Sequence, residues 1–191
     1  MTTTGNEAIP LVDGSHVEVR PMVAGDRDRM LSFARSLPDH DLLFLRRDIT
    51  RPEEIDGWLS DIASGGSTTL VATDDGQIVG YASVSRSSPP WRRHVAELRV
   101  LTAPGRRGQG LGRALTNHAF LAAVDLGVEK MVAQMTPDQE VAIGVFYRLG
   151  FEQEARLVRE VQDRGGRKHD LIVLSHDVSS YQEARRARDE A

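Results

Sequence analysis

The segment Pro104–Gly112, with the sequence PGRRGQGLG, constrains the fold of this 191-residue chain more than any other feature. It separates a strand-like run, His94–Thr102, from an amphipathic helical run, Gly108–Gly127. Unpaired backbone N–H groups and the positive end of the helix dipole meet at such a turn, and glycines at 108, 110 and 112 let an anion reach the backbone. The segment therefore predicts a phosphate-binding turn between a strand and a helix.

The apolar pattern of the whole chain predicts one mixed α/β (α+β) domain with the order β, α, α, β, β, β, α, β, α, β, β. Alternating runs predict strands over His16–Arg20, Thr68–Thr73, Gln77–Arg86, His94–Thr102, Lys130–Met135, Ala155–Val161 and His169–His176. Helical spacing predicts helices over Asp26–Leu37, from an N-cap at Thr50 to Ile62, over Gly108–Gly127 and over Pro137–Leu149. Asp74–Gly76 and Asp163–Gly166 are typical hairpin turns, and Gly150 suits the left-handed end of the last helix.

Composition excludes several classes of protein. The chain has 24 Lys and Arg against 28 Asp and Glu, so its formal net charge is −4. It lacks the basic excess that a dedicated nucleic-acid binder needs. The absence of cysteine excludes disulfides, thiolate metal sites and a thiol nucleophile, and it is typical of a reducing compartment, so we expect a cytoplasmic location. The six histidines show neither HxxxH nor HExxH spacing, and we expect no metal.

The ends of the chain differ from its middle. We expect a flexible N-terminal segment over residues 1–15, a single domain over 16–178, and a charged C-terminal helix or tail over 179–191. The sequence contains neither a secretory signal nor an apolar stretch of the ~20 residues that a membrane span requires, so we expect no membrane partner.

Two familiar phosphate loops do not fit the glycine segment. The dinucleotide fingerprint GxGxxG, counted from Gly108, requires a glycine where Arg113 stands. A P-loop counted from Gly105 requires lysine and serine or threonine at positions 111 and 112, which are leucine and glycine. The pattern that fits is Arg-x-x-Gly-x-Gly over Arg107–Gly112, which resembles the pyrophosphate-binding segment of the GCN5-related N-acetyltransferase (GNAT) superfamily.

A second motif supports this resemblance. Val145–Phe151, VFYRLGF, is similar to the late-helix motif of the superfamily, and the likeness covers about residues 17–176. The resemblance implies a central mixed, mostly antiparallel sheet of about seven strands with helices on both faces. It also implies that two parallel strands, His94–Thr102 and Lys130–Met135, are splayed apart.

The resemblance implies acetyl-CoA as the acyl donor. Its pyrophosphate would lie on Arg107, Gly108, Gln109, Gly110, Leu111, Gly112 and Arg113. Its pantetheine arm would add to the exposed edge of the preceding strand, at the backbone of Leu101 and Thr102.

Transfer of an acetyl group to an amine needs a base for the ammonium and a proton for the departing thiolate. We assign the base, acting through water, to Glu97, where several members of the superfamily carry an acidic residue, with Asp138 and Glu140 as weaker candidates. We assign the acid to Tyr147, since a phenol near pKa 10 matches the basicity of a thiolate. Many relatives have an asparagine where this chain has Glu140, which we interpret as a first-turn partner of the helix dipole.

The acceptor and the alternatives stay open. The leading hypothesis is an N-acetyltransferase that works in a ternary complex; a catalytically silent acyl-CoA sensor is the alternative, and a Rossmann-type redox domain ranks third. The acceptor would be shaped by Phe33–Ile62, Ser87–Arg93 and Asp163–His169, whose mixed charges select neither a cationic nor an anionic molecule. A small amine, amino acid, polyamine, antibiotic, protein lysine or protein N-terminus all remain candidates, nucleic acid is not expected, and a homodimer is left open.

Overall fold

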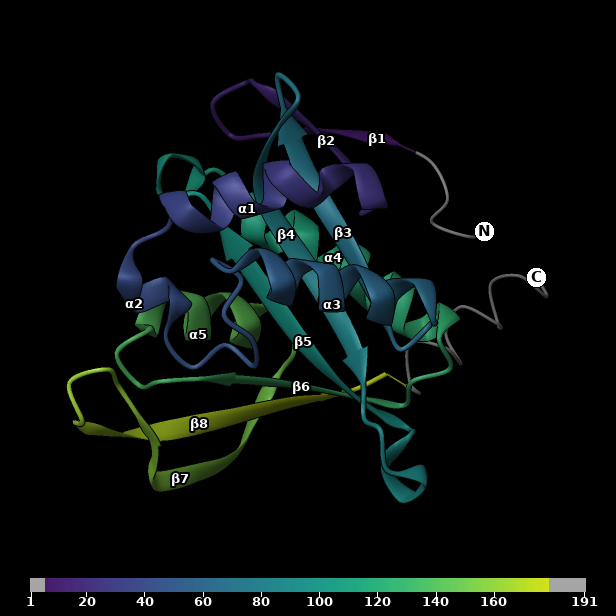
Figure 1. Ribbon diagram of the computed structural model, residues 1–191. Coiled ribbons are helices and arrows are strands. Elements are labelled where there is room, and N and C mark those ends of the chain that lie inside the picture. Colours follow the sequence, from purple (N-terminus) through teal and green to yellow (C-terminus); the bar gives the residue numbers. More distant parts are fainter. Residues whose placement is uncertain (1–5, 179–191) are drawn as a thin grey trace.

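The computed structural model of the chain describes residues 6–178 and contains an eight-stranded sheet in the order β1-β2-β3-β4-β5-β6-β8-β7 (Figure 1). The expected C-terminal helix or tail over 179–191 lies outside the described residues. The strands are β1 Glu7–Pro10, β2 His16–Pro21, β3 Ser67–Asp74, β4 Gln77–Arg86, β5 Val95–Thr102, β6 Lys130–Met135, β7 Glu152–Gln162 and β8 Lys168–Asp177. All neighbouring strands are antiparallel except β5 and β6.

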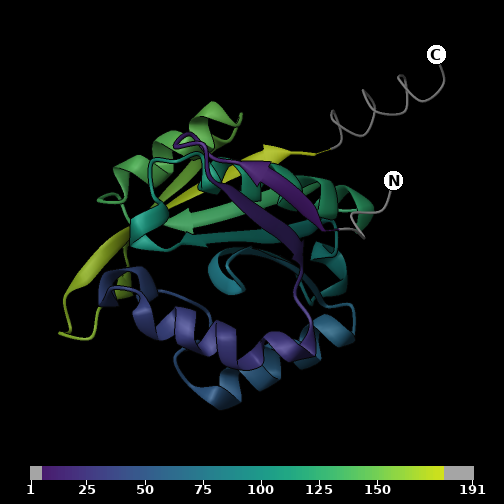
Figure 2. The same cartoon turned by 90° about the horizontal axis from the view of Figure 1, so that it is seen from above.

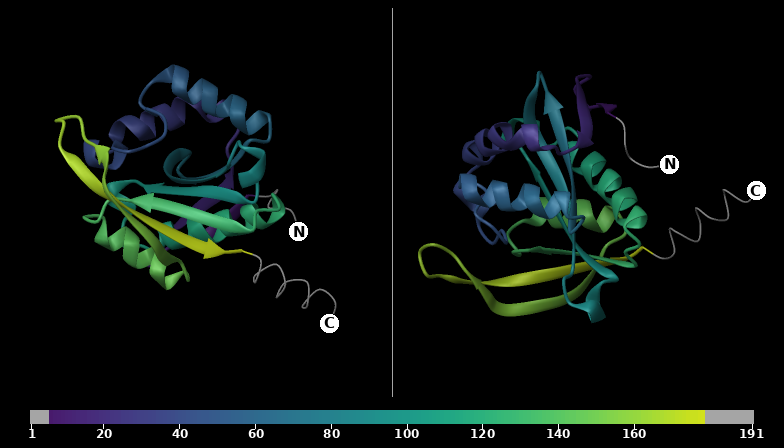
Figure 3. Two further views of the ribbon diagram at one scale, coloured as in Figure 1. Left: turned by 90° about the horizontal axis from the view of Figure 1, so that it is seen from below. Right: turned by 45° about the vertical axis from the view of Figure 1, so that its right-hand side comes forward.

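The helices form a layer on each face of this sheet. They are α1 Arg27–Ser36, α2 Asp39–Leu42, α3 Pro52–Ala63, α4 Leu111–Asp125 and α5 Glu140–Arg148, with short 3-10 turns at Ala24–Asp26, Pro90–Arg92 and Pro104–Arg106. Figures 2 and 3 show α1 and α3 on one face and α4 and α5 on the other. Within residues 6–178, no helix is both long enough and apolar enough to cross a bilayer.

The N-terminal segment that was expected to be flexible contains β1, a strand that the sequence did not predict. Strand β1 pairs with β2, with Ala8 opposite Glu18 and Ile9 opposite Val17. The four residues EAIP carry no alternation long enough to indicate a strand, so the pairing partner and not local propensity makes them extended. From residue 7 onward, the N-terminal segment therefore belongs to the sheet.

Several helix boundaries also differ from the expected ones. Helix α4 begins at Leu111 and not at Gly108, because Gly108 and Gly110 have φ angles of +74° and +88°, which are incompatible with a helix. The N-cap of α3 is Arg51 and not Thr50, with Pro52 as the first helical residue. Gly150 follows α5 with φ +86°, which confirms the expected left-handed end.

The alternation of side chains along the strands divides the core between the two faces. Ala82, Val84 and Leu98 pack with α4 in one cluster, whereas Val71 and Tyr81 pack with α1 and α3 in the other. The face under α1 and α3 therefore receives the odd-numbered side chains of β5 and, from Tyr81 onward, of β4.

A buried ion pair joins β2 to the start of α1. Asp26 is completely buried and accepts two 2.7 Å hydrogen bonds from the guanidinium of Arg20. It also accepts one from the backbone N–H of Val23 at 2.9 Å, and Arg29 lies 2.9 Å away. This cluster joins the end of β2 to the start of α1 and so helps to position the layer of α1 and α3 on the sheet.

Candidate active site

Strands β5 and β6 separate along their length, as the resemblance implied. They pair only between Val95–Glu97 and Lys130–Val132, and beyond these residues the two ribbons diverge (Figure 1). A narrow cavity of about 70 Å³ lies between them, lined by β5 and β6 residues together with Asp41, Leu43, Phe44, Leu45, Gln139, Ala142 and Phe146. Leu101 lines this opening, Thr102 ends the same strand, and the diverging edge of β5 can accept an extended ligand by backbone hydrogen bonds.

The glycine turn lies beyond the end of β5 and leads into α4. Gly110 is the N-cap of α4 and provides no side-chain cap, and the first turn of the helix carries no acidic residue. A Cβ at Gly108 or Gly112 would meet nothing within 4 Å, so the space above the turn is open. The side-chain oxygen of Gln109 is buried without a hydrogen-bond partner in the described chain. Open amides at the positive end of a 15-residue helix can hold an anion.

The two arginines of the turn are already paired. Arg107 forms an ion pair with Asp41, and Arg106 forms one with Asp74. Their charges are therefore partly neutralised by the protein, and the backbone of the turn, with Arg113 exposed beside it, carries more of an anion site than the arginine pair does.

A larger pocket of about 660 Å³ lies on the face of the sheet under α1 and α3. Its lining comes from the loop before α3, from α3, from β3 to β5 and from the loop after β4: Leu45, Arg46, Arg47, Ile49, Trp58, Asp61, Gly66, Ser67, Tyr81, Ser83, Ser85, Arg86, Ser87, Ser88, Arg93 and Arg99. Two of the three segments expected to shape the acceptor contribute to it, and Asp163–His169 does not.

Sequence reasoning missed the side of this pocket that β4 provides. Tyr81, Ser83 and Ser85 occupy alternate positions of β4, so their side chains share one face. The signal was present in the sequence as small polar residues at every second position of an otherwise apolar strand. The strand register places Ser83 opposite Arg99 and Ser85 opposite Glu97, which carries the polar stripe on to β5.

Glu97 lines neither cavity, but both of its arginine partners line the larger pocket, and one of them, Arg99, also lines the opening between the strands. It is the last β5 residue paired with β6, and its side chain is 19% exposed. Its Oε1 accepts a hydrogen bond of 2.7 Å from Arg99, and Arg46 Nη1 lies 3.5 Å from its Oε2. Arg99 and Leu45 line both cavities, so an amine in the pocket and a ligand in the opening would meet beside Arg99, which contacts Glu97.

The structure does not bring Tyr147 to this junction. The side chain is exposed, and its hydroxyl lies 3.5 Å from Oε1 of Gln153, on β7. Its neighbour Phe146 is 6% exposed and lines the opening, because one residue along a helix turns a side chain by about 100°. Glu140, the first residue of α5, is exposed, and Asp138 lies 3.2 Å from Nε2 of His40.

Comparisons with known proteins agree with this architecture. Over 144 residues the chain is 32% identical to mycothiol acetyltransferase of Kytococcus sedentarius, an alignment that covers 73% of this chain and 46% of the relative. The chain thus spans about half the length of that relative. It is also 32% identical to the L-methionine sulfoximine/L-methionine sulfone acetyltransferase of Pseudomonas aeruginosa, over 61% of this chain and 69% of the relative.

Among solved structures, a GNAT superfamily phosphinothricin acetyltransferase from Sinorhizobium meliloti in complex with AcCoA has the same fold. The TM-score is 0.74 at 23% identity, covering 84% of this chain and 88% of the other. The model of the Acetyltransferase (GNAT) family matches residues 33–151, which include the glycine turn, the diverging strands and α5. The chain belongs to the GNAT acetyltransferase family.

Proposed function

We propose that this protein is an N-acetyltransferase that moves the acetyl group of acetyl-CoA to a primary amine by direct attack in a ternary complex. The junction of the two cavities carries this proposal. The opening between β5 and β6 and the 660 Å³ pocket share Arg99 and Leu45, so two ligands can bind at once with their ends in contact. The chain has no cysteine to carry the acyl group, which favours direct transfer over a covalent relay.

The described residues fit acetyl-CoA at two places. The turn from Arg107 to Arg113 would hold the pyrophosphate through the N-terminal amides of α4. The free edge of β5, at Leu101 and Thr102, would hold the pantetheine arm as an added strand. Acetyl-CoA supplies an activated thioester, and the chain supplies orientation and proton transfer.

Glu97 accepts the proton in the proposed reaction. The nitrogen of the acceptor must lose a proton before or as it forms a bond with the acetyl carbon, and Glu97 takes that proton through a water molecule. The carbon–sulfur bond then breaks, and the thiolate leaves with its electron pair and is protonated. Arg99 holds the carboxylate of Glu97 in place by its 2.7 Å contacts.

The identity of the acid that protonates the thiolate stays a prediction. The sequence assigned it to Tyr147, whose hydroxyl lies beside Gln153 and whose side chain lines neither cavity. We propose that a water molecule supplies this proton instead.

Substitution of Gly112 tests the donor site with opposite effects on stability and binding. Gly112 is the second residue of α4, its Cβ position is open, and its backbone is compatible with other residues. Gly112→Asp places an acid at the helix N-terminus, which should stabilise the free protein by about 0.3–1 kcal/mol, while it repels a pyrophosphate. CoA at a hundredfold excess over its Kd should stabilise the wild type by about 2.7 kcal/mol.

We expect thermal unfolding to show that Gly112→Asp raises the melting temperature without CoA and abolishes the shift with CoA. Gly112→Asn, which has the same size without the charge, is the matched control: it separates crowding from charge repulsion and should keep more of the shift than Gly112→Asp. An unchanged shift in Gly112→Asp would contradict the donor site. CoA binding without turnover across a broad screen of amines and peptides would favour the silent sensor.

A further inference from the structure

The 660 Å³ pocket is strongly cationic although the whole chain is acidic. Five arginines and one aspartate line it. Arg47 pairs with Asp61 at 2.6 Å, and Arg46 and Arg99 share the carboxylate of Glu97. Within residues 6–178, Arg86 and Arg93 form no ion pair. Even with Glu97 counted at the edge, guanidiniums outnumber carboxylates by three, and in a partly enclosed site such an excess favours an anionic group.

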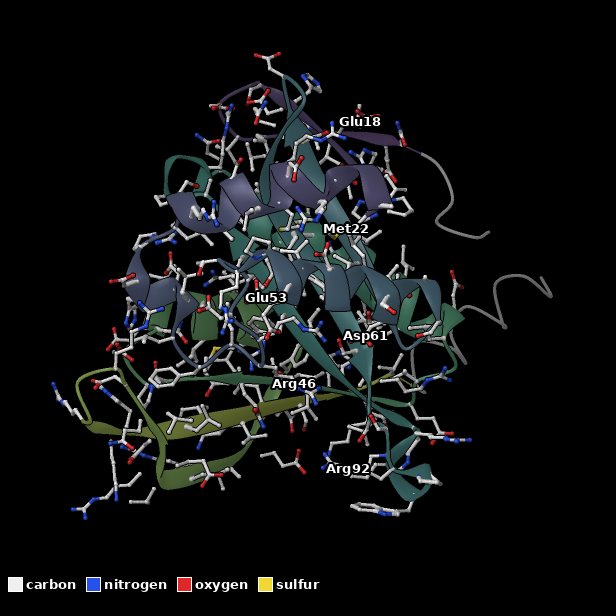
Figure 4. All side chains as sticks on the ribbon, in the orientation of Figure 1. Glu18, Met22, Arg46, Glu53, Asp61 and Arg92 are labelled. Carbon is white, nitrogen blue, oxygen red and sulfur yellow. The ribbon has the colours of Figure 1, made fainter. Side chains whose placement is uncertain are left out.

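Of the two arginines that contact Glu97, Arg46 is the one better placed to bind a ligand. Its contact with Glu97 is a single long one of 3.5 Å, whereas Arg99 makes two contacts of 2.7 Å with the same carboxylate. The Arg46 side chain is 62% exposed and comes from the loop before α3 (Figure 4). Arg99 is therefore held by the protein, and Arg46 can turn toward an oxyanion in the pocket at little cost.

A buried hydroxyl at the pocket wall also lacks a partner. Ser67 is 6% exposed, lines the pocket, and its Oγ makes no hydrogen bond within the described chain. It stands opposite Ser85 in the sheet, and Ser85 in turn stands opposite Glu97. A buried hydroxyl is costly unless a ligand or water satisfies it, and here it lies on the same wall as the arginines.

The floor of the pocket is aromatic and uncharged. Trp58 and Tyr81 are buried with their ring centroids 5.0 Å apart, and burial raises the pKa of Tyr81 far above its usual value, so that the phenol is neutral. Trp58 Nε1 already donates to Thr69 at 3.0 Å. The floor thus offers apolar surface to a ligand side chain and no further charge.

From these features we infer that the acceptor is an α-amino acid, whose carboxylate binds Arg46 and the pocket wall while its amine faces Glu97. The inference rests on the proposed function and adds the class of acceptor to it. A carboxylate matches the planar guanidinium by charge-assisted hydrogen bonds. A polyamine would bring only positive charge to a pocket that already has an excess of it, and a lysine within a protein has no carboxylate at that distance from its amine.

Matched acceptors test the inference. Each of the common L-amino acids and its carboxamide is offered with acetyl-CoA, together with spermidine and a lysine peptide, and release of the CoA thiol is measured. Amidation removes the carboxylate charge that stabilises the ammonium, so the amide loses its proton more readily and on intrinsic reactivity should be the better acceptor. We expect the reverse, with kcat/KM higher for the best amino acid than for its amide by about 10- to 100-fold, as for a charge-assisted contact.

Arg46→Gln should remove most of this preference, so that the ratio of kcat/KM for acid and amide falls toward 1. Arg51→Gln is the matched control, because Arg51 is 60% exposed, pairs with Glu53 and lies outside the pocket. Its ratio should equal that of the wild type, and both variants should unfold at the wild-type temperature.

Equal or faster acetylation of the amide, or turnover of spermidine or the peptide alone, would overturn the inference while upholding the proposed function. The same holds if Arg46→Gln keeps the full preference in a folded protein. Turnover of none of the acceptors, with CoA still bound, would overturn both.

Discussion

Replacement of Asp26 by asparagine should be among the most damaging single changes in this protein. The completely buried carboxylate holds Arg20 by two 2.7 Å hydrogen bonds, and the Arg20 side chain is only 15% exposed. Removal of one partner of a buried ion pair leaves the other charge uncompensated, which typically costs about 3–5 kcal/mol. Arg29, the other cationic partner, is 39% exposed and can return to water, so we take the lower end, about 3 kcal/mol.

The loss should be visible in equilibrium unfolding. At about 2–4 °C per kcal/mol for a domain of this size, the melting temperature should fall by about 6–12 °C. Urea unfolding followed by tryptophan fluorescence is a suitable assay, because Trp58 is buried in the layer that the ion pair anchors. Asp28→Asn is the control: this side chain, in the first turn of the same helix, is 89% exposed, so its removal should cost at most about 1 kcal/mol, well below the loss in Asp26→Asn.

The direction of the pKa shift of Asp26 determines how this stability difference depends on pH. Burial alone raises the pKa of Asp26, but hydrogen bonds from Arg20 and the Val23 backbone, with the charges of Arg20 and Arg29, outweigh it and hold the pKa below its usual value. The carboxylate therefore contributes stability above the unfolded pKa of about 3.9, and this is lost as pH falls through the lower folded value. The difference between wild type and Asp26→Asn should narrow toward pH 3. A deficit under about 1 kcal/mol at pH 7, or one independent of pH, would refute the reasoning.

Two further predictions concern the reaction. Tyr147→Phe should lower kcat only slightly, far less than the roughly 10²- to 10⁴-fold loss that removal of a general acid causes. A loss in that range, with unchanged CoA affinity, would identify Tyr147 as the acid. Glu97→Gln should lower the rate chiefly at low pH, where the acceptor amine is most protonated, with an effect that shrinks as pH approaches the pKa of the amine; a pH-rate profile parallel to that of the wild type would contradict its role as base.

Local features of this protein could be predicted from its sequence. The hairpin at Asp75 and Gly76 and the end of α5 at Gly150 depend on positive φ angles that these residue types accept, and all three adopt them. The glycine turn at the start of α4 is equally local, so this candidate phosphate-binding site could be predicted before any packing was known. The splayed strands and the GNAT fold were what the resemblance of two motifs to the superfamily implied.

The acceptor pocket depended on packing between distant segments. Arg46 and Arg47 precede α3, Arg99 lies on β5, and Arg93 lies in the loop between β4 and β5. In the sequence Arg46 and Arg47 lie near Asp39, Asp41 and Asp48, and this mixture of charges left the charge of the acceptor open. Only the fold decides which charges share one cavity, because Coulomb interactions depend on distances in space.

The positions of β1 and Tyr147 have the same kind of cause. A four-residue strand has no stable extended form until β2 provides its hydrogen bonds. The motif around α5 placed an aromatic pair near the site, but the rotation of the helix against β6 and β8 decided that Phe146 lines the opening and Tyr147 faces Gln153. Sequence alone determined what depends on single residues and their near neighbours; the tertiary structure decided which side chains meet, since that is set by the packing of whole elements against one another.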